Sequence, residues 1–246
     1  MDSSTLVWLA LLMGLAAALY STVGHGGASA YLAIMALFAT APETMRPTAL
    51  ALNLIVAGVG AWRYARAGQI NMRLLTAFVV TAAPAAFVGG GISVPSEIYR
   101  PMVGVLLWVA AIRLMWQPTQ LAAHTPRQPP LVLTLPVGAG LGLLAGLTGT
   151  GGGIFLSPLI ILFGWEDARR TSGVAAGFIF LNSLAGLAGN VAAVRALPAE
   201  LPWLIGAVAA GALVGTWLGS ARLAKPRLLQ GLGLVLVSAG AKLIFS

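Results

Sequence analysis

The sequence has 246 residues, of which 59% are hydrophobic and 8% are charged, and its mean hydropathy is +0.92. Soluble domains carry charge on about a quarter of their residues, so this composition excludes a soluble globular protein and predicts an integral membrane protein. The net charge of +8 is therefore interpreted as a record of orientation in the bilayer, and no nucleic-acid partner is expected. Cysteine is absent, which excludes disulfides, thiolate metal sites and cysteine nucleophiles.

The apolar stretches approach the roughly 20 residues that a helix needs to cross the hydrocarbon of a bilayer. Because a helix satisfies its own backbone polar groups in lipid, we expect an all-α polytopic membrane protein. The first stretch is interpreted as a retained helix, since Met1-Asp2-Ser3 has none of the basic residues of a signal peptide. Breaks at proline and glycine delimit ten segments in chain order: 5–22, 28–40, 47–66, 73–92, 98–116, 132–147, 153–164, 171–194, 202–220 and 227–245.

The second five segments repeat the order of the first five. Gly24-His25-Gly26-Gly27 aligns with Gly149-Thr150-Gly151-Gly152, and Leu52-Asn53 aligns with Leu181-Asn182 further on. Two matches in the same order favour a duplication. The sequence thus predicts an N-terminal transmembrane repeat over 1–116, a polar, proline-rich cytoplasmic linker over 117–130 and a C-terminal transmembrane repeat over 131–246.

The distribution of basic residues predicts that the two halves are inverted. Lys and Arg in short loops prefer the cytoplasm, and 10 of the 14 basic residues lie at cytoplasmic ends if each glycine-broken pair of segments enters and leaves on one side. A continuous span at each break would put one of the two strongest basic loops on the wrong side. We therefore expect two inverted repeats of about five helical segments each, an architecture common in secondary transporters. Whether the broken pairs are re-entrant or fully crossing stays open.

Each half is interrupted by a glycine cluster that we expect near the midplane of the membrane. A helix that begins there exposes unpaired N–H groups with about half a positive charge, and glycine lets the backbone approach a ligand closely. Two such ends facing each other predict one shared anion-binding site; the alternative is that the glycines only allow close helix packing. The glycines concerned are Gly24, Gly26, Gly27, Gly149, Gly151, Gly152 and Gly153.

Four polar side chains accompany the breaks. His25 can donate to an anion or carry a coupling proton, or it is a neutral histidine that bonds a carbonyl; Thr150 takes its place in the second half. Asn53 and Asn182, each inside an apolar segment, either bridge helices or donate to a substrate oxygen. No Asp or Glu lies within a predicted span, so we expect a small anionic substrate and neither a metal site nor a cofactor.

The second break reads GTGGGIFLSPL from Gly149 to Leu159, followed by Arg170-Thr171-Ser172 and a long apolar helix. In these residues the chain resembles the sulfite exporter TauE/SafE family, and the likeness extends over essentially the whole sequence. The resemblance implies transport of small sulfur-containing anions such as sulfite, thiosulfate or organosulfonates across the inner membrane, coupled to an ion gradient.

Three functional hypotheses remain. The first is a secondary transporter that binds an oxyanion at the paired breaks, and the second is a passive anion channel. The third is an intramembrane hydrolase using His25 and Ser29, which is disfavoured because no serine-elbow motif or third orienting group accompanies them; no catalytic residue is expected. The anion, the direction and the coupling ion stay open, as does the oligomeric state, with a homodimer among the alternatives.

Overall fold

The computed structural model describes residues 3–22, 26–115, 127–191, 197–219 and 226–245. Every regular element in these ranges is an α-helix, which confirms the all-helical class. The ten helices are α1 (Ser3–Thr22), α2 (Ala28–Leu37), α3 (Pro42–Arg66), α4 (Met72–Gly91), α5 (Ser96–Met115), α6 (Leu131–Thr148), α7 (Gly153–Leu162), α8 (Ala168–Gly189), α10 (Leu201–Gly219) and α11 (Pro226–Phe245).

Each of the ten expected segments corresponds to one helix. The largest differences are that α3 begins at Pro42 rather than at residue 47, and that α8 ends at Gly189 rather than at 194. Proline is favoured at the first position of a helix, and Ala41 before it is extended. The start of α3 was therefore misjudged because Pro47, which lies inside the helix, was interpreted as the boundary.

Two groups of helices differ in length. Five of them, α1, α3, α4, α6 and α8, are long and apolar enough to cross a membrane by length and composition. In contrast, α2 and α7 have ten residues each, which is about 15 Å of helix and half the thickness of the hydrocarbon core. They are half-length helices that follow directly on the two glycine breaks.

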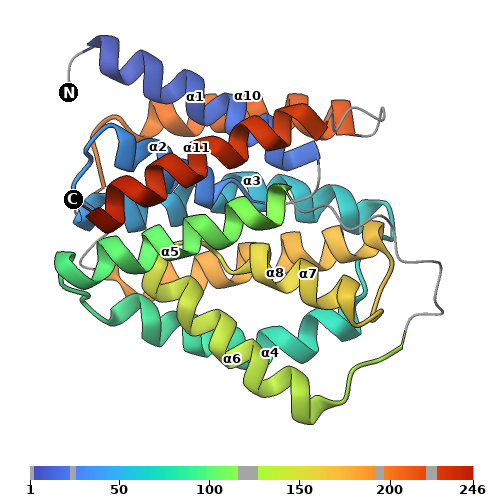
Figure 1. The fold of residues 1–246 in the computed structure, drawn as a ribbon. Coiled ribbons are helices and arrows are strands. Elements are labelled where there is room, and N and C mark those ends of the chain that lie inside the picture. The colour runs from blue at the N-terminus through green and yellow to red at the C-terminus, as the bar shows by residue number, and fades with distance from the viewer. Residues whose placement is uncertain (1–2, 23–25, 116–126, 192–196, 220–225, 246) are drawn as a thin grey trace.

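Figure 1 shows the helices side by side, with the start of α1 and the end of α11 at the same end of the bundle.

Helices α4 and α6 run parallel with their backbones in contact. A Cβ atom on Gly142 would meet the carbonyl oxygen of Ala82, and one on Gly146 would meet that of Ala86. Close approach through glycine is a common way for membrane helices to associate.

The pair α1 and α10 packs in the same way as α4 and α6. It is also parallel: a Cβ on Gly211 would meet the carbonyl oxygen of Gly14, and one on Gly215 would meet that of Ala18. The contacts between α4 and α6, the first helix of the second half, therefore match those between α10 and α1, the first helix of the chain.

Two further pairs are antiparallel. In α5 and α11, Gly104 faces the carbonyl oxygen of Gly240 while Gly240 faces the carbonyl oxygen of Gly104. Helices α3 and α8 also run in opposite directions, because Gly173 near the start of α8 contacts Gln69 just after the end of α3.

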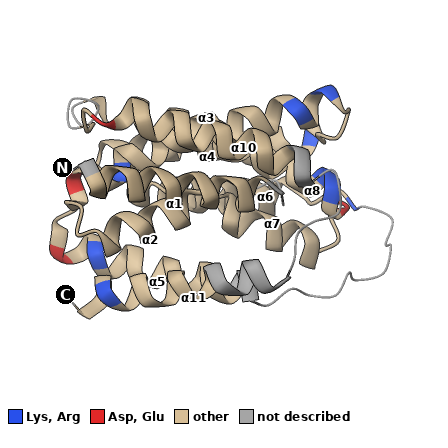
Figure 2. Ribbon diagram, turned by 90° about the horizontal axis from the view of Figure 1, so that it is seen from above, with Lys and Arg blue, Asp and Glu red and all other residues tan. Residues whose placement is uncertain are grey.

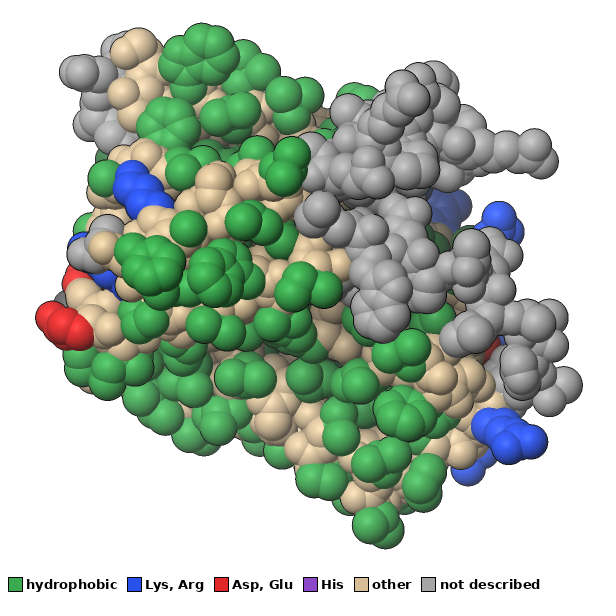
Figure 3. Space-filling model, viewed as in Figure 1, with side chains coloured by type: hydrophobic (Ala, Val, Ile, Leu, Met, Phe, Trp, Pro, Cys, Tyr) green, Lys and Arg blue, Asp and Glu red, His purple; other side chains and the backbone are tan. Residues whose placement is uncertain are grey.

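Among the described residues, the charged ones lie at the two ends of the bundle (Figure 2). We call one end the basic end; its described charged residues are Arg63, Arg66, Arg73, Arg127, Glu166, Asp167, Arg169 and Arg170. At the opposite end are Glu43, Arg46, Glu97, Arg100, Glu200 and Lys242. Between them the face shown in Figure 3 is largely hydrophobic. Val80, Val105 and Leu234, which lie well inside their helices, are each more than half exposed, as expected for a surface in contact with lipid.

Candidate functional site

The second break is a turn that requires glycine. Gly149 ends α6 with φ 84°, and Gly151 and Gly152 have φ 72° and 76° before α7 begins at Gly153. These angles lie in the left-handed region, which residues other than glycine adopt only with strain. The glycine run therefore lets the chain leave α6, turn back and start α7 within a few residues.

The first break is described only at its end. Gly24 and His25 lie outside the described residues, so the structure does not test either candidate. Gly27 is the N-cap residue of α2, with φ −87° and no side-chain cap. Gly26 before it lies against Asn53 of α3.

Asn53 lies between the two breaks. A Cβ atom built on Gly26 would be 2.8 Å from Asn53 Oδ1, and one built on Gly151 would be 2.8 Å from Asn53 Nδ2. Ile179, near the middle of α8, lies at the same place, because its Cγ2 atom would be 3.0 Å from the first Cβ and 2.8 Å from the second. The two breaks thus meet across one asparagine and one isoleucine.

The half-helices leave this meeting point toward opposite ends of the bundle. At the end of α2, the carbonyl oxygen of Leu37 accepts a hydrogen bond from Lys242 at the opposite end. After α7, the carbonyl oxygen of Gly164 accepts from the backbone N–H of Arg127 at the basic end. The N-termini of α2 and α7 therefore both start near the meeting point, and neither has a side-chain cap.

Several polar atoms around this point are fully buried and lack a hydrogen-bond partner among the described residues. They are Asn53 Oδ1, both side-chain polar atoms of Asn182, and Ser183 Oγ. Asn182 and Ser183 follow Ile179 by three and four positions on α8, so all three lie on neighbouring positions of one helix face. A buried polar group without a partner costs roughly 1–3 kcal/mol, and ligand binding is one reason for a protein to retain it.

The contacts of the two asparagines bear on the alternative that they only bridge helices. Asn53 Nδ2 donates to the backbone oxygen of Thr150 over 3.4 Å, a long bond that joins α3 to the second break. Asn182 makes no hydrogen bond to any described residue. Among the described residues, Asn53 therefore takes part in bridging, whereas no bridging partner of Asn182 is found.

The remaining predicted residues line the second break. Thr150 is buried, and its hydroxyl pairs with the hydroxyl of Thr148 at 3.0 Å. Gly152 lies against the ring of Phe178, and Gly153 lies against Ile179. Among the described residues, no group of three His, Cys, Asp or Glu side chains could hold a metal ion.

Sequence reasoning missed Ile179 and Ser183. Ile179 carries no signal, since it is one apolar residue in an apolar helix. Ser183 follows Asn182 directly in that helix, so the polar pair could have been noted. A Cβ atom built on Gly151 would lie 3.1 Å from Ser183 Oγ. This approach depends on how α8 packs against the break, which the sequence does not show.

Two residues outside the predicted site lie beside the second break, toward the opposite end of the bundle. The Arg46 guanidinium is buried and donates to the carbonyl oxygens of Gly89, Gly90 and Ile92 at the end of α4. Its backbone lies against Gly149.

The second of these residues is Tyr99. Its hydroxyl donates to the backbone oxygen of Thr148 over 3.1 Å. Together with Arg46, it covers the start of the break on this side. Both side chains donate hydrogen bonds to backbone oxygens, while Arg46 Nε has no partner among the described residues.

Comparison with known proteins finds matches over nearly the whole chain. The family model described as "Sulfite exporter TauE/SafE" matches residues 9–243. A protein of Sinorhizobium fredii (strain NBRC 101917 / NGR234), described as "Probable membrane transporter protein y4hK", is 38% identical over 242 residues, which are 97% of this chain and 98% of that protein. No solved structure matches the chain. This multi-pass membrane protein is thus a transporter rather than an enzyme, and it belongs to the sulfite exporter TauE/SafE family.

Proposed function

We propose that the chain is a secondary transporter of small sulfur-containing anions, namely sulfite, thiosulfate or an organosulfonate, in the inner membrane. The description of its family supports the sulfur chemistry. The observation that carries the proposal is that two uncapped half-helix N-termini meet across Asn53 and Ile179. Substrate would bind at this point to the residues of both breaks, Gly24–Gly27 and Gly149–Gly153, and to Asn53 and Asn182.

The charge at this point favours an anion. Each helix N-terminus carries about half a positive charge, and two of them act on the same volume. The unpartnered Asn182 Nδ2 and Ser183 Oγ supply neutral donors to the oxygens of an oxyanion. Of the acidic residues that the structure describes, Glu166 is buried. It lies at the basic end, where its Oε2 accepts a hydrogen bond of 2.6 Å from Asn71, the N-cap residue of α4.

The two halves, 1–116 and 131–246, act as inverted repeats joined by a cytoplasmic linker over 117–130. Three features support this arrangement: α3 and α8 are antiparallel, the pair α4 and α6 is matched by the pair α10 and α1, and Gly104 and Gly240 contact each other's carbonyl oxygens. Reciprocal contacts of this kind are expected for equivalent residues on a two-fold axis.

The basic end faces the cytoplasm, as the positive-inside rule requires. Each broken pair, α1 with α2 and α6 with α7, then begins and ends on one side of the membrane and is re-entrant, since the ten-residue second helix is too short to cross. Alternating access follows from motion of one half against the other around the shared site.

His25 is the proposed proton-coupling residue. If it carries the coupling proton, His25→Ala protein in vesicles binds the anion more weakly, because a residue of the first break is changed, and its flux no longer responds to a pH gradient. Saturable, gradient-driven flux of the unaltered protein supports a transporter, whereas flux that never saturates and ignores the gradient supports the passive channel.

The sharpest test of the site is Asn182→Leu, a substitution that keeps the number and branching of the side-chain heavy atoms. The buried amide has no partner in the described structure, so replacing it with an apolar side chain is expected to leave thermal stability unchanged or slightly raised. Binding of the preferred anion, found with a panel of sulfite, thiosulfate, sulfate and sulfonates, is expected to fall by at least about tenfold, the effect of losing roughly 1.4 kcal/mol.

Asn71→Ala is the matched control. Asn71 caps α4 and bonds Glu166, so its loss lowers the stability by about 1 kcal/mol and leaves anion affinity unchanged. Unaltered anion affinity in a stable Asn182→Leu protein would refute the site.

A further inference from the structure

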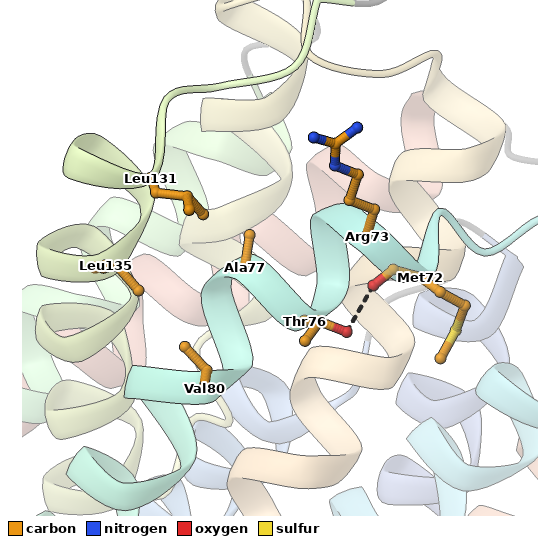
Figure 4. Close-up of a pocket in the computed structure, with 7 residues that line it drawn as sticks. All are labelled: Met72, Arg73, Thr76, Ala77, Val80, Leu131 and Leu135. Carbon is orange, nitrogen blue, oxygen red and sulfur yellow. Dashed lines mark hydrogen bonds between the residues drawn. The ribbon is translucent and has the colours of Figure 1, made fainter.

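A groove of about 500 Å³ opens on the outer surface between α4 and α6 at the basic end. Figure 4 shows Leu131 and Leu135 of α6 on one side and Ala77 and Val80 of α4 on the other. The walls between the two helices are therefore apolar. Because the chain is a membrane protein, this surface is one that lipid covers.

The packing of the two helices explains why the groove lies where it does. Further along, their backbones touch: Gly138 has no room for a Cβ beside the oxygen of Phe78, and Thr81 Oγ1 donates to the oxygen of Leu135 over 2.7 Å. Toward their N-termini the helices leave a gap instead. The groove extends along α4 from Met72 to Val80, about 12 Å at the rise of an α-helix.

Thr76 and Arg73 are the polar side chains of the groove. The Thr76 hydroxyl donates to the oxygen of Met72 over 2.8 Å, so its hydrogen is already used within α4. Arg73 lies at the N-terminal end of the groove (Figure 4), is exposed, and has no hydrogen-bond or carboxylate partner in the described part of the chain. An apolar groove with one unpaired cation at its end matches a molecule with an apolar chain and an anionic head.

We propose that this groove binds an anionic phospholipid, with one acyl chain between α4 and α6 and the phosphate at Arg73. A guanidinium donates to two phosphate oxygens at once, and basic pockets between membrane helices on the cytoplasmic side bind acidic head groups. In the equivalent pair of helices, α10 begins Leu201-Pro202 where α4 begins Met72-Arg73, so no cation stands at this position there. The bound lipid therefore belongs to the leaflet at the basic end.

The test uses the purified full-length protein in detergent and counts bound lipid by native mass spectrometry. Phosphatidylglycerol and phosphatidylcholine with identical acyl chains are titrated separately. Arg73→Gln is expected to lower the affinity for phosphatidylglycerol about tenfold, as for the loss of one charge-assisted contact, and to leave phosphatidylcholine unaffected. Arg169→Gln removes an exposed arginine from the same end outside the groove and is expected to change neither.

A second variant tests the acyl-chain part of the site while keeping the cation. Val80→Trp fills the groove from an exposed position, so the fold is expected to tolerate it, and it abolishes the preferential binding of phosphatidylglycerol. The proposal is overturned if Val80→Trp protein of unchanged thermal stability still binds this lipid normally, or if Arg169→Gln lowers its affinity as much as Arg73→Gln. Competition by soluble glycerol phosphate at similar concentration would overturn it too, because a head-group site alone would then explain the binding.

Discussion

The two helix breaks meet at the same pair of side chains but need glycine for different reasons. In the second break, Gly151 and Gly152 have positive φ angles, so the backbone conformation itself favours glycine. In the first, Gly27 has φ −87°, which any residue can adopt, but a Cβ there would lie 2.4 Å from the ring of Tyr31. Among the described glycines, the second break thus combines a conformational requirement with close contacts, whereas the first shows a steric requirement alone.

The breaks also differ in what holds them. Beside the second break, toward the end of the bundle opposite the basic end, Arg46 and Tyr99 both donate hydrogen bonds to backbone oxygens. Near the first break, the corresponding feature that the structure describes is a bond of 2.7 Å between the hydroxyls of Tyr20 and Ser29. We therefore expect substitutions around the second break to have the larger effects.

The largest effect is expected for Arg46→Ala. The change leaves the buried carbonyl oxygens at the end of α4 without their donor, and at roughly 1–3 kcal/mol for each unpaired buried group we expect a loss of about 3 kcal/mol of stability. Thermal unfolding in detergent measures it. Arg100→Ala at the same end, which has no hydrogen-bond partner among the described residues, is the control and should change stability by less than about 0.5 kcal/mol; equal losses would contradict the bonding seen for Arg46.

Gly151→Ala tests the conformational requirement. A left-handed backbone costs other residues about 1–2 kcal/mol, and the added Cβ would also contact Asn53 and Ile179. Gly164→Ala carries the same strain, with φ 64°, but has nothing within 4 Å. Both variants should unfold at lower temperature, and only Gly151→Ala should also lose anion affinity in a binding assay. A loss of affinity in both would mean that strain alone, and no local contact, disturbs the site.

Gly27→Ala tests the steric requirement. Overpacking against Tyr31 is expected to destabilise the protein by about 1–2 kcal/mol. Because the obstacle is a side chain, Tyr31→Leu in the same protein should restore about 1 kcal/mol, measured as a coupling energy in a double-mutant cycle. The same Tyr31→Leu change combined with Gly151→Ala should be additive. Rescue in both combinations, or in neither, would remove the distinction between the breaks.

The smallest effect is expected for Tyr99→Phe. It removes one hydrogen bond to the backbone oxygen of Thr148, worth about 1 kcal/mol, from the side of the second break. Tyr64→Phe, whose hydroxyl has no partner among the described residues, serves as control in the same thermal-unfolding measurement. If the two variants unfold at the same temperature, the Tyr99 bond does not support the break.

Much of the fold could be predicted from the sequence because its signals are local. Long apolar runs predict membrane helices, and glycine and proline mark where these runs end, so the short helices after Gly27 and Gly152 were expected at their observed places. The start of α3 was missed because a proline inside a helix and a proline at its first position look alike without the preceding backbone. Asn53 and Asn182 were expected to be important from their polarity in apolar segments and from their matched places in the two repeats.

Hydrophobicity and chain-breaking residues therefore determined the membrane location, the helix positions and the two interruptions, since each depends on residues close together in the chain. The tertiary structure decided that Gly26 and Gly151 meet across Asn53, that Ile179 and Ser183 join them, and that the Arg46 guanidinium binds the end of α4. These contacts join residues from tens to more than a hundred positions apart. They depend on how whole helices pack against one another, which no single stretch of sequence encodes.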